Sequence, residues 1–239
     1  MKYIYGPVQS RRLGLSLGVS LTPYKICNFD CVYCQLGRTK EKTNLKKEYV
    51  KPDDILNELK SWLAYNPDSA KQLNFITLSG MGEPTLNSRI AEIITEIRKI
   101  SGLKIAVITN SSLLPDASVR QSIKEADLIV PSLDSVDEKI FRQIDRPGEA
   151  IHAEDVINGL INLRREFRGF IWLEVMLVKG LNDSLGHARK LKEAIERINP
   201  DKIQLNSPVR TSAEPGIEAV GKNKLEKIRE ILGNKCEIF

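Results

Sequence analysis

The sequence predicts an α/β protein, built as a partial (β/α)6 barrel with parallel strands. Two observations predict this class. Short apolar runs of strand length alternate with longer stretches in which apolar residues recur at helical spacing. Six such runs occur, and each is followed by a connection that usually contains a helix. Because crossovers between parallel strands are right-handed in nearly every case, this order favours a curved, all-parallel sheet or a partial barrel.

The first two βα units occupy the N-terminal part of the chain. A strand is expected at residues 17–22, and Asp53 and Asp54 stand where they would cap the following helix. Residues 73–78 form a short apolar run that fits a buried parallel strand. Both helices carry an apolar face, the first at Ile55, Leu56, Leu59 and Leu63, the second, after Asn87, at Ile90, Ile93, Ile94 and Ile97.

The middle of the chain continues the same alternation. A strand at residues 104–109 precedes a helix at 116–126. The next strand, at 128–133, is expected to finish near Pro131, because proline cannot donate a ladder hydrogen bond. The pair Pro147 and Gly148 then divides a helical region into two helices, at residues 137–144 and 153–167.

The longest strand candidate spans residues 170–178. Asp183 is expected to cap the next helix, which stops before Pro200. A last strand at 202–205 and a last helix at 223–232 follow. We expect a single domain over residues 1–239, in which 1–22 form an N-terminal extension and the first strand, 23–206 the core, and 207–239 a C-terminal segment with its helix.

The composition is that of an ordinary folded protein, with 41% hydrophobic and 28% charged residues. No apolar run has the length of a signal peptide or a membrane span, so we expect a cytoplasmic protein with no membrane partner. The net charge of +5 is mild and spread along the chain, which favours solubility over a nucleic-acid partner. The densest basic run, residues 38–47, is either a solvated loop or a rim that contacts phosphates.

Three of the four cysteines stand close together, at Cys27, Cys31 and Cys34, with the spacing CxxxCxxC. Three thiolates can hold three corners of a [4Fe-4S] cube and leave the fourth iron open to a substrate or cosubstrate. A ferredoxin that only transfers electrons would be expected to have four cysteine ligands near its cluster. The spacing therefore favours a reactive iron-sulfur site.

A structural zinc site, as in a zinc-binding nucleic-acid-binding module, is the alternative of another class. It needs a fourth ligand and usually comes as two separated pairs. The remaining candidates are Cys236, His152 and His187, and none has the spacing of a partner pair. We interpret both histidines as surface or capping residues. The one remaining cysteine, Cys236, is not enough to build a second cluster. Iron-sulfur binding is therefore preferred to zinc.

The cysteine motif, with Tyr33 directly before its last cysteine, resembles the signature of the radical S-adenosylmethionine (radical SAM) superfamily, whose core is a partial barrel. The resemblance implies that the cluster binds S-adenosyl-L-methionine. One-electron reduction then yields methionine and a 5′-deoxyadenosyl radical, which abstracts a hydrogen from a substrate. It also implies a reducing partner such as flavodoxin or ferredoxin.

The family resemblance extends to cofactor-binding residues at the strand ends. The segment Gly80-Met81-Gly82-Glu83-Pro84 resembles a GGE-like element that binds the methionine end of the cofactor, although such glycines also occur in ordinary strand-to-helix turns. The resemblance makes Tyr33, Gly80, Gly82 and Glu83 candidates for cofactor binding. It adds the later strand-end residues Asn110, Ser132 and Asp134, as partners of the ribose and the methionine carboxylate.

Other polar residues near the strand ends have two interpretations. Glu174 interrupts an apolar strand, where a charge is costly unless it is paired or faces a polar cavity. Residues 178–183, including Lys179 and Asn182, resemble a G-x-N-D loop of the family, whose plainer role is turn formation and helix capping. We assign no acid-base catalyst, so the reaction is expected to depend mainly on the radical.

Two further segments, residues 6–14 and 204–210, resemble a small branch grouped with the tRNA wyosine-base synthases. The sequence differs from those synthases in having no cysteine before Cys27. The resemblance leaves three substrate classes open: a tRNA base, a protein glycine as in glycyl-radical-activating enzymes, and a small metabolite.

Overall fold

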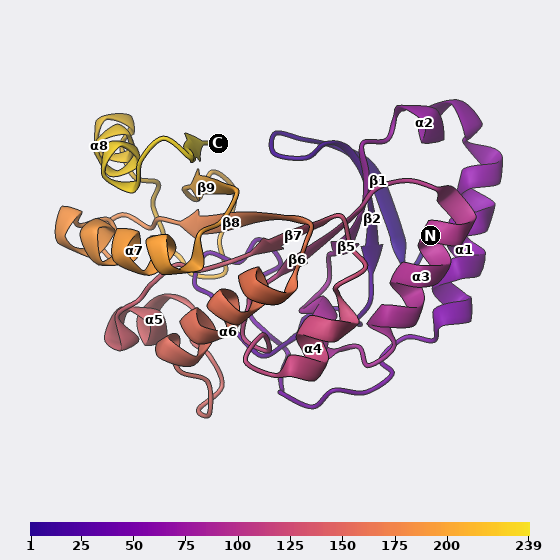
Figure 1. Cartoon of the computed structure of the whole chain (residues 1–239), viewed down its shortest axis with the longest axis horizontal. Coiled ribbons are helices and arrows are strands. Elements are labelled where there is room, and N and C mark those ends of the chain that lie inside the picture. The colour runs from indigo at the N-terminus through magenta and orange to yellow at the C-terminus, as the bar shows by residue number, and fades with distance from the viewer.

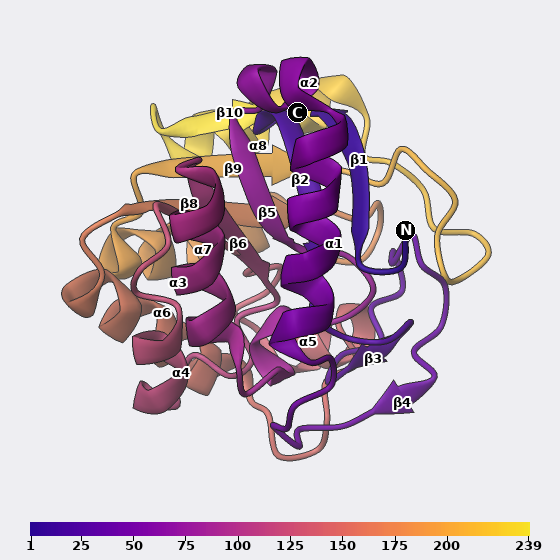
Figure 2. The ribbon, with the colours of Figure 1, turned by 90° about the vertical axis from the view of Figure 1, so that its right-hand side faces the viewer.

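The computed structural model describes residues 1–239 and contains one large sheet with helices on its outer side (Figures 1 and 2). The strand order is β1-β2-β5-β6-β7-β8-β9-β10. These strands are β1 Ile4–Ser10, β2 Gly14–Ser20, β5 Phe75–Ser79, β6 Ile105–Thr109, β7 Leu128–Pro131, β8 Phe170–Met176, β9 Lys202–Asn206 and β10 Cys236–Ile238. A separate parallel pair joins β3 Ile26–Cys27 to β4 Glu41–Lys42.

The six predicted strands are all present in the predicted order, as β2 and β5 to β9, and neighbouring members are parallel. The expectation of an all-parallel sheet is wrong at one edge, where β1 pairs antiparallel with β2. Most side chains of β1 are at least partly exposed, so no apolar alternation reveals it in the sequence. At the other edge, β10 adds a parallel strand of only 3 residues. The partial barrel is confirmed, with an added strand on each side.

The helices follow the strands as predicted, with corrected ends. They are α1 Pro52–Tyr65, α2 Pro67–Gln72, the 3-10 helix η1 Pro84–Leu86, α3 Ile90–Ser101, α4 Ala117–Ser122, α5 Glu138–Ile144, α6 Ala153–Glu166, α7 Leu185–Ile198 and α8 Lys222–Leu232. Asp53 and Asp54 lie in the first turn of α1, because Lys51 occupies the cap and Pro52 begins the helix. Ser184, and not Asp183, caps α7 through its side chain.

Alternation along the strands divides the apolar residues between the two faces of the sheet. One face packs against the helices and forms the main core, to which Ile76, Val107 and Ile129 belong. Their neighbours Ala106, Leu128 and Val130 belong to a smaller cluster on the concave face. Leu13, from the turn between β1 and β2, completes that cluster and is 5% exposed. The hairpin therefore covers part of the barrel interior.

None of the helices has the length and the apolar character needed to cross a membrane.

Candidate functional site

The three predicted ligand cysteines lie in the connection between β2 and α1, at the carboxyl edge of the sheet. This connection is bonded to the segment that follows β5: Lys25 N–H donates to Met81 O at 2.6 Å, and Glu83 N–H donates to Ile26 O at 3.2 Å. Since β2 and β5 are neighbours, their ends bring the two segments together. The cysteines and the Gly80–Glu83 segment are therefore joined directly.

Both glycines of this segment are required by close contacts. A Cβ on Gly82 would lie 1.9 Å from Ile26 O, which is far inside contact distance. Gly80 has a φ of +104°, and a Cβ there would lie 3.0 Å from the ring of Tyr5. The close neighbours of both glycines are other parts of this protein.

Glu83 is buried and organises the strand ends around it. Its carboxylate accepts hydrogen bonds from Thr85 N (3.1 Å), Thr85 Oγ1 (2.6 Å), Thr109 Oγ1 (2.7 Å) and Asn110 N (2.8 Å). Burial raises the pKa of Glu83, and these hydrogen bonds oppose that rise. With four donors already in place, the carboxylate positions the start of the β6–α4 connection rather than reaching outward.

Polar donors approach two of the cysteine sulfurs. Asn110 Nδ2 lies 3.5 Å from Cys27 Sγ, and Lys25 Nζ lies 3.1 Å from Cys34 Sγ. Burial raises the pKa of Cys27 to about 12 and that of Cys31 well above its ordinary value. A bound metal centre compensates such a cost, because thiolate ligands give up their protons to it. Hydrogen bonds and a cation at the sulfurs also suit a cluster, whose potential they adjust.

The donor set of this site fits a [4Fe-4S] cluster. Three thiols come from one loop, and the fourth cysteine, Cys236, is buried in β10 at the edge of the sheet next to β9. A cube takes each thiolate at a different iron corner, so three cysteines can hold it with one iron left open. The arrangement therefore favours the cluster over the structural zinc alternative.

Four predicted cofactor residues gather around a small cavity of about 10 Å³ beside the cysteine loop: Tyr33, Asn110, Ser132 and Asp134. The Tyr33 hydroxyl donates to Asp134 and lies 3.5 Å from Asp145 Oδ1. Burial raises the pKa of Asp134 to about 6 and that of Asp145 well above its ordinary value. The neighbouring Asp134 carboxylate raises the pKa of Asp145 further, because two negative charges so close together repel.

Glu174 combines both roles that its sequence context allowed. Its Oε1 lies 2.5 Å from Arg12 Nη1 and accepts a hydrogen bond from Asn206 Nδ2 at 2.9 Å. It also lines a cavity of about 320 Å³. Lys179 is different, because it is exposed and pairs with Glu218 at 2.6 Å.

The loop after β8 has the turn-forming role expected of it. The side chain of Asn182 accepts from Val178 N at 2.7 Å and donates to both Met176 O and Asp134 O at 2.8 Å. Asp183 accepts from Gly180 N at 3.1 Å instead of capping α7.

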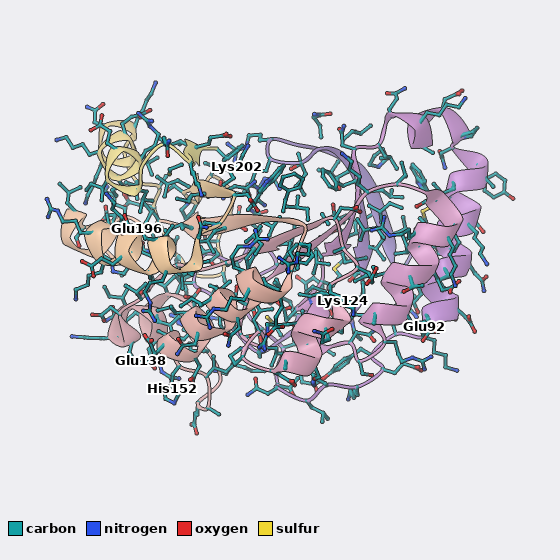
Figure 3. The ribbon with its side chains drawn as sticks, viewed as in Figure 1. Glu92, Lys124, Glu138, His152, Glu196 and Lys202 are labelled. Carbon is teal, nitrogen blue, oxygen red and sulfur yellow. The ribbon has the colours of Figure 1, made fainter.

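The two histidines differ. His152 lies at the outer edge of the molecule beside Glu138, as the sequence predicts (Figure 3). His187 is buried in α7, so its interpretation as a surface or capping residue is wrong. Its Nε2 lies 3.5 Å from Asp134 O, and burial lowers its pKa. Neither histidine lies at the cysteine loop.

Three residues at the site have no place in the sequence-based interpretation. Lys25 reaches Cys34, Asp145 lies 3.4 Å from Cys31 Sγ, and Asn28 is buried and accepts from Asn110 Nδ2 at 2.7 Å. Lys25 and Asn28 flank Cys27 in the sequence, so a charge and an amide beside a ligand were available signals. Asp145 follows a helix far from the cysteines in the sequence, so no neighbouring cysteine points to it.

Comparison with known proteins identifies the family to which this fold and this cysteine loop belong. The family model described as "Radical SAM superfamily" matches residues 21–191. The chain is 37% identical over 237 residues to a protein named GTPase Obg of Brachyspira hyodysenteriae, covering 99% of this chain but 34% of that relative's length. It is 34% identical to UPF0026 protein MJ1312 of Methanocaldococcus jannaschii, covering 98% of this chain and 77% of the relative.

Solved structures share the fold. A radical SAM methyltransferase from Sphaerobacter thermophilus superposes with a TM-score of 0.73 at 16% identity, over 94% of this chain and 65% of the other. Archaeal TYW1 gives 0.61 at 17% identity, over 91% and 71%. The structure of Streptococcus suis SuiB bound to S-adenosylmethionine gives 0.64 at 14%, over 89% and 46%.

The extent of the family match decides the assignment. It covers the cysteine loop and every parallel strand from β5 to β8. The cofactors of this family are a [4Fe-4S] cluster and S-adenosylmethionine. The chain therefore belongs to the radical SAM superfamily of enzymes.

Proposed function

We propose that this chain holds a [4Fe-4S] cluster through Cys27, Cys31 and Cys34, binds S-adenosylmethionine beside it, and directs the resulting radical to abstract hydrogen from a substrate. One observation carries the proposal. The loop with three cysteines is hydrogen-bonded to the Gly80–Glu83 segment and to Asn110, so the proposed ligands of the cluster and of the cofactor form one unit. The reaction would be of the oxidoreductase or lyase type.

Each protein group has a role in this proposal. When bound, the cluster supplies the electron that cleaves S-adenosylmethionine to methionine and the 5′-deoxyadenosyl radical. Lys25 and Asn110 donate toward the sulfurs of Cys34 and Cys27, and such donors favour the more negative, reduced state of a cluster. The Glu83 carboxylate keeps Asn110 in place by accepting a hydrogen bond from the Asn110 backbone N–H.

The remaining strand-end residues would bind the cofactor. Backbone groups of Gly80–Glu83 would take its methionine end, and Asn110, Ser132 and Asp134 its ribose and carboxylate. Tyr33 connects the cysteine loop to this group through Asp134. An external one-electron donor such as flavodoxin or ferredoxin completes the system.

The test is anaerobic reconstitution with iron and sulfide, followed by dithionite and S-adenosylmethionine. We expect about four irons per chain and release of 5′-deoxyadenosine. Cys31→Ala should abolish release, because the cluster would lose one of its three protein ligands.

Cys236→Ala is the matched control, because Cys236 lies in β10 and should leave both iron content and 5′-deoxyadenosine release intact. A wild-type protein that keeps tightly bound zinc and releases no 5′-deoxyadenosine would contradict the proposal.

A further inference from the structure

The cavity of about 320 Å³ is distinct from the small one described above, although Tyr33 lines both. It is formed between the β1–β2 hairpin and the segment that follows β9, two parts of the chain far apart in sequence. Figure 2 shows β1 and β2 in indigo near the upper centre and the yellow-orange loop that follows β9 to their right. The volume of this cavity is typical of a site for a small molecule, or for one group of a larger molecule.

The charges that line this cavity are unbalanced. Arg11, Arg12 and Arg210 contribute three guanidinium groups, and Glu174 is the only carboxylate. Glu174 is paired with Arg12, whose Nη1 is buried yet makes no hydrogen bond of acceptable geometry. Arg11 is exposed and has no partner, and Arg210 donates only to the neutral amide of Gln35, at 3.1 Å. Two cations therefore remain without a counter-charge.

The cavity borders the proposed cofactor site on two sides. Tyr33, between the cysteines Cys31 and Cys34, lines it. Tyr5 also lines it, and its hydroxyl lies 2.6 Å from Ser79 Oγ while its ring covers Gly80. A group held in this cavity would therefore lie next to the segments proposed to hold the cluster and the cofactor.

We infer that this cavity is the substrate site and that it binds the substrate through a phosphate or carboxylate group held by Arg11 and Arg210. The inference rests on the proposed function, because it assigns the substrate class of the same reaction. Guanidinium groups bind both oxyanions through paired hydrogen bonds, and two unpaired ones in one cavity form a receptor for such a group. Arg12, neutralised by Glu174, would shape the inner wall.

Binding of inorganic phosphate and of succinate to the reconstituted protein tests this, by calorimetry at constant ionic strength with chloride as the reference anion. We expect at least one of the two to bind at a single site. The anion that binds identifies the group as a phosphate or a carboxylate. Arg11→Gln and Arg210→Gln should each weaken binding by at least about tenfold, the loss expected for a charge-assisted hydrogen bond.

Arg168→Gln is the matched control, because this exposed arginine does not line the cavity and its replacement changes the net charge equally. The inference is overturned if neither anion binds the wild type better than chloride, or if all three variants bind alike. The 5′-deoxyadenosine assay separates the two proposals. Cofactor cleavage without anion binding refutes the substrate site alone, and anion binding without cleavage refutes the proposed function while leaving an anion site.

Discussion

Gly82 shows how a single residue joins the two halves of the site. The carbonyl oxygen of Ile26, one residue before Cys27, occupies the space where a side chain would begin. The amide of Glu83 donates to the same oxygen. The contact is therefore both a hydrogen bond and a steric fit, and only glycine satisfies the second condition.

Gly82→Ala should disrupt this contact. The added methyl must displace backbone, so we expect the free energy of unfolding to fall by about 1–3 kcal/mol. We also expect less iron per chain after reconstitution, because the cysteine loop would move. Urea unfolding and iron analysis measure the two effects.

Gly186→Ala is the control for that variant. Gly186 lies in α7, and no atom lies within 4 Å of where a Cβ would be added, so alanine should leave stability equal or higher. Full iron content and unchanged stability in Gly82→Ala would show that the loops do not need this close contact.

At the scale of elements, α4 depends on a cap that also anchors the cysteine-containing connection. Asp116 accepts from Ser118 N at 2.8 Å and pairs with Lys46 at 2.6 Å. Lys46 belongs to the basic run 38–47, for which the sequence left open a solvated loop or a phosphate-contacting rim. This member of the run has an internal partner, so part of the run serves to hold the loop.

The Asp116 cap should make stability depend on pH. The hydrogen bond from Lys46, followed by that from Ser118, lowers the pKa of Asp116 to about 2. Because the folded pKa is below the unfolded value of about 3.8, the stabilisation is complete above about pH 4 and is lost as pH falls toward 2. Asp116→Ala should cost about 1 kcal/mol at pH 7, the usual value of a cap, and less at pH 2.5.

Urea unfolding of wild type and variant at both pH values measures this dependence. Asp116→Asn, which retains a capping oxygen but no charge, should lose less at pH 7 because an exposed ion pair contributes under about 1 kcal/mol. An Asp116→Ala penalty that is equal at the two pH values would contradict the assignment.

At the scale of the whole molecule, the β1–β2 hairpin determines what the concave face of the partial barrel can hold. Leu13 fills one part of the interior beside Leu128 and Val130. The preceding residues Arg11 and Arg12 line the larger cavity. A short turn therefore both covers part of the concave face and provides the charges of the proposed substrate site.

Leu13→Ala should leave a cavity inside the barrel. We expect a loss of about 2–4 kcal/mol in the free energy of unfolding, as for other buried leucines. Leu45→Ala is the control, because Leu45 is 60% exposed and should change stability little. A small effect of Leu13→Ala would mean that the hairpin does not depend on this contact.

Residue spacing and apolar runs along the chain were enough to predict the loop with three cysteines, the six parallel strands and their order. Thiolate spacing is local, and a strand buried on both faces leaves a continuous apolar run in the chain. The same locality placed Asn110, Ser132 and Asp134 at strand ends, where parallel strands bring their carboxyl ends together.

The residues that support that loop, and the groups around it, are set by long-range contacts in the folded chain. The contacts of Lys25 with Cys34 and of Asp145 with Cys31 depend on side-chain directions, and Asp145 comes from more than a hundred residues away. The edge strand β1 has no apolar pattern, and the cavity with Arg11 and Arg210 forms only when the two ends of the sheet curve toward each other. These features depend on packing between distant segments, which the spacing of residues along the chain does not reveal.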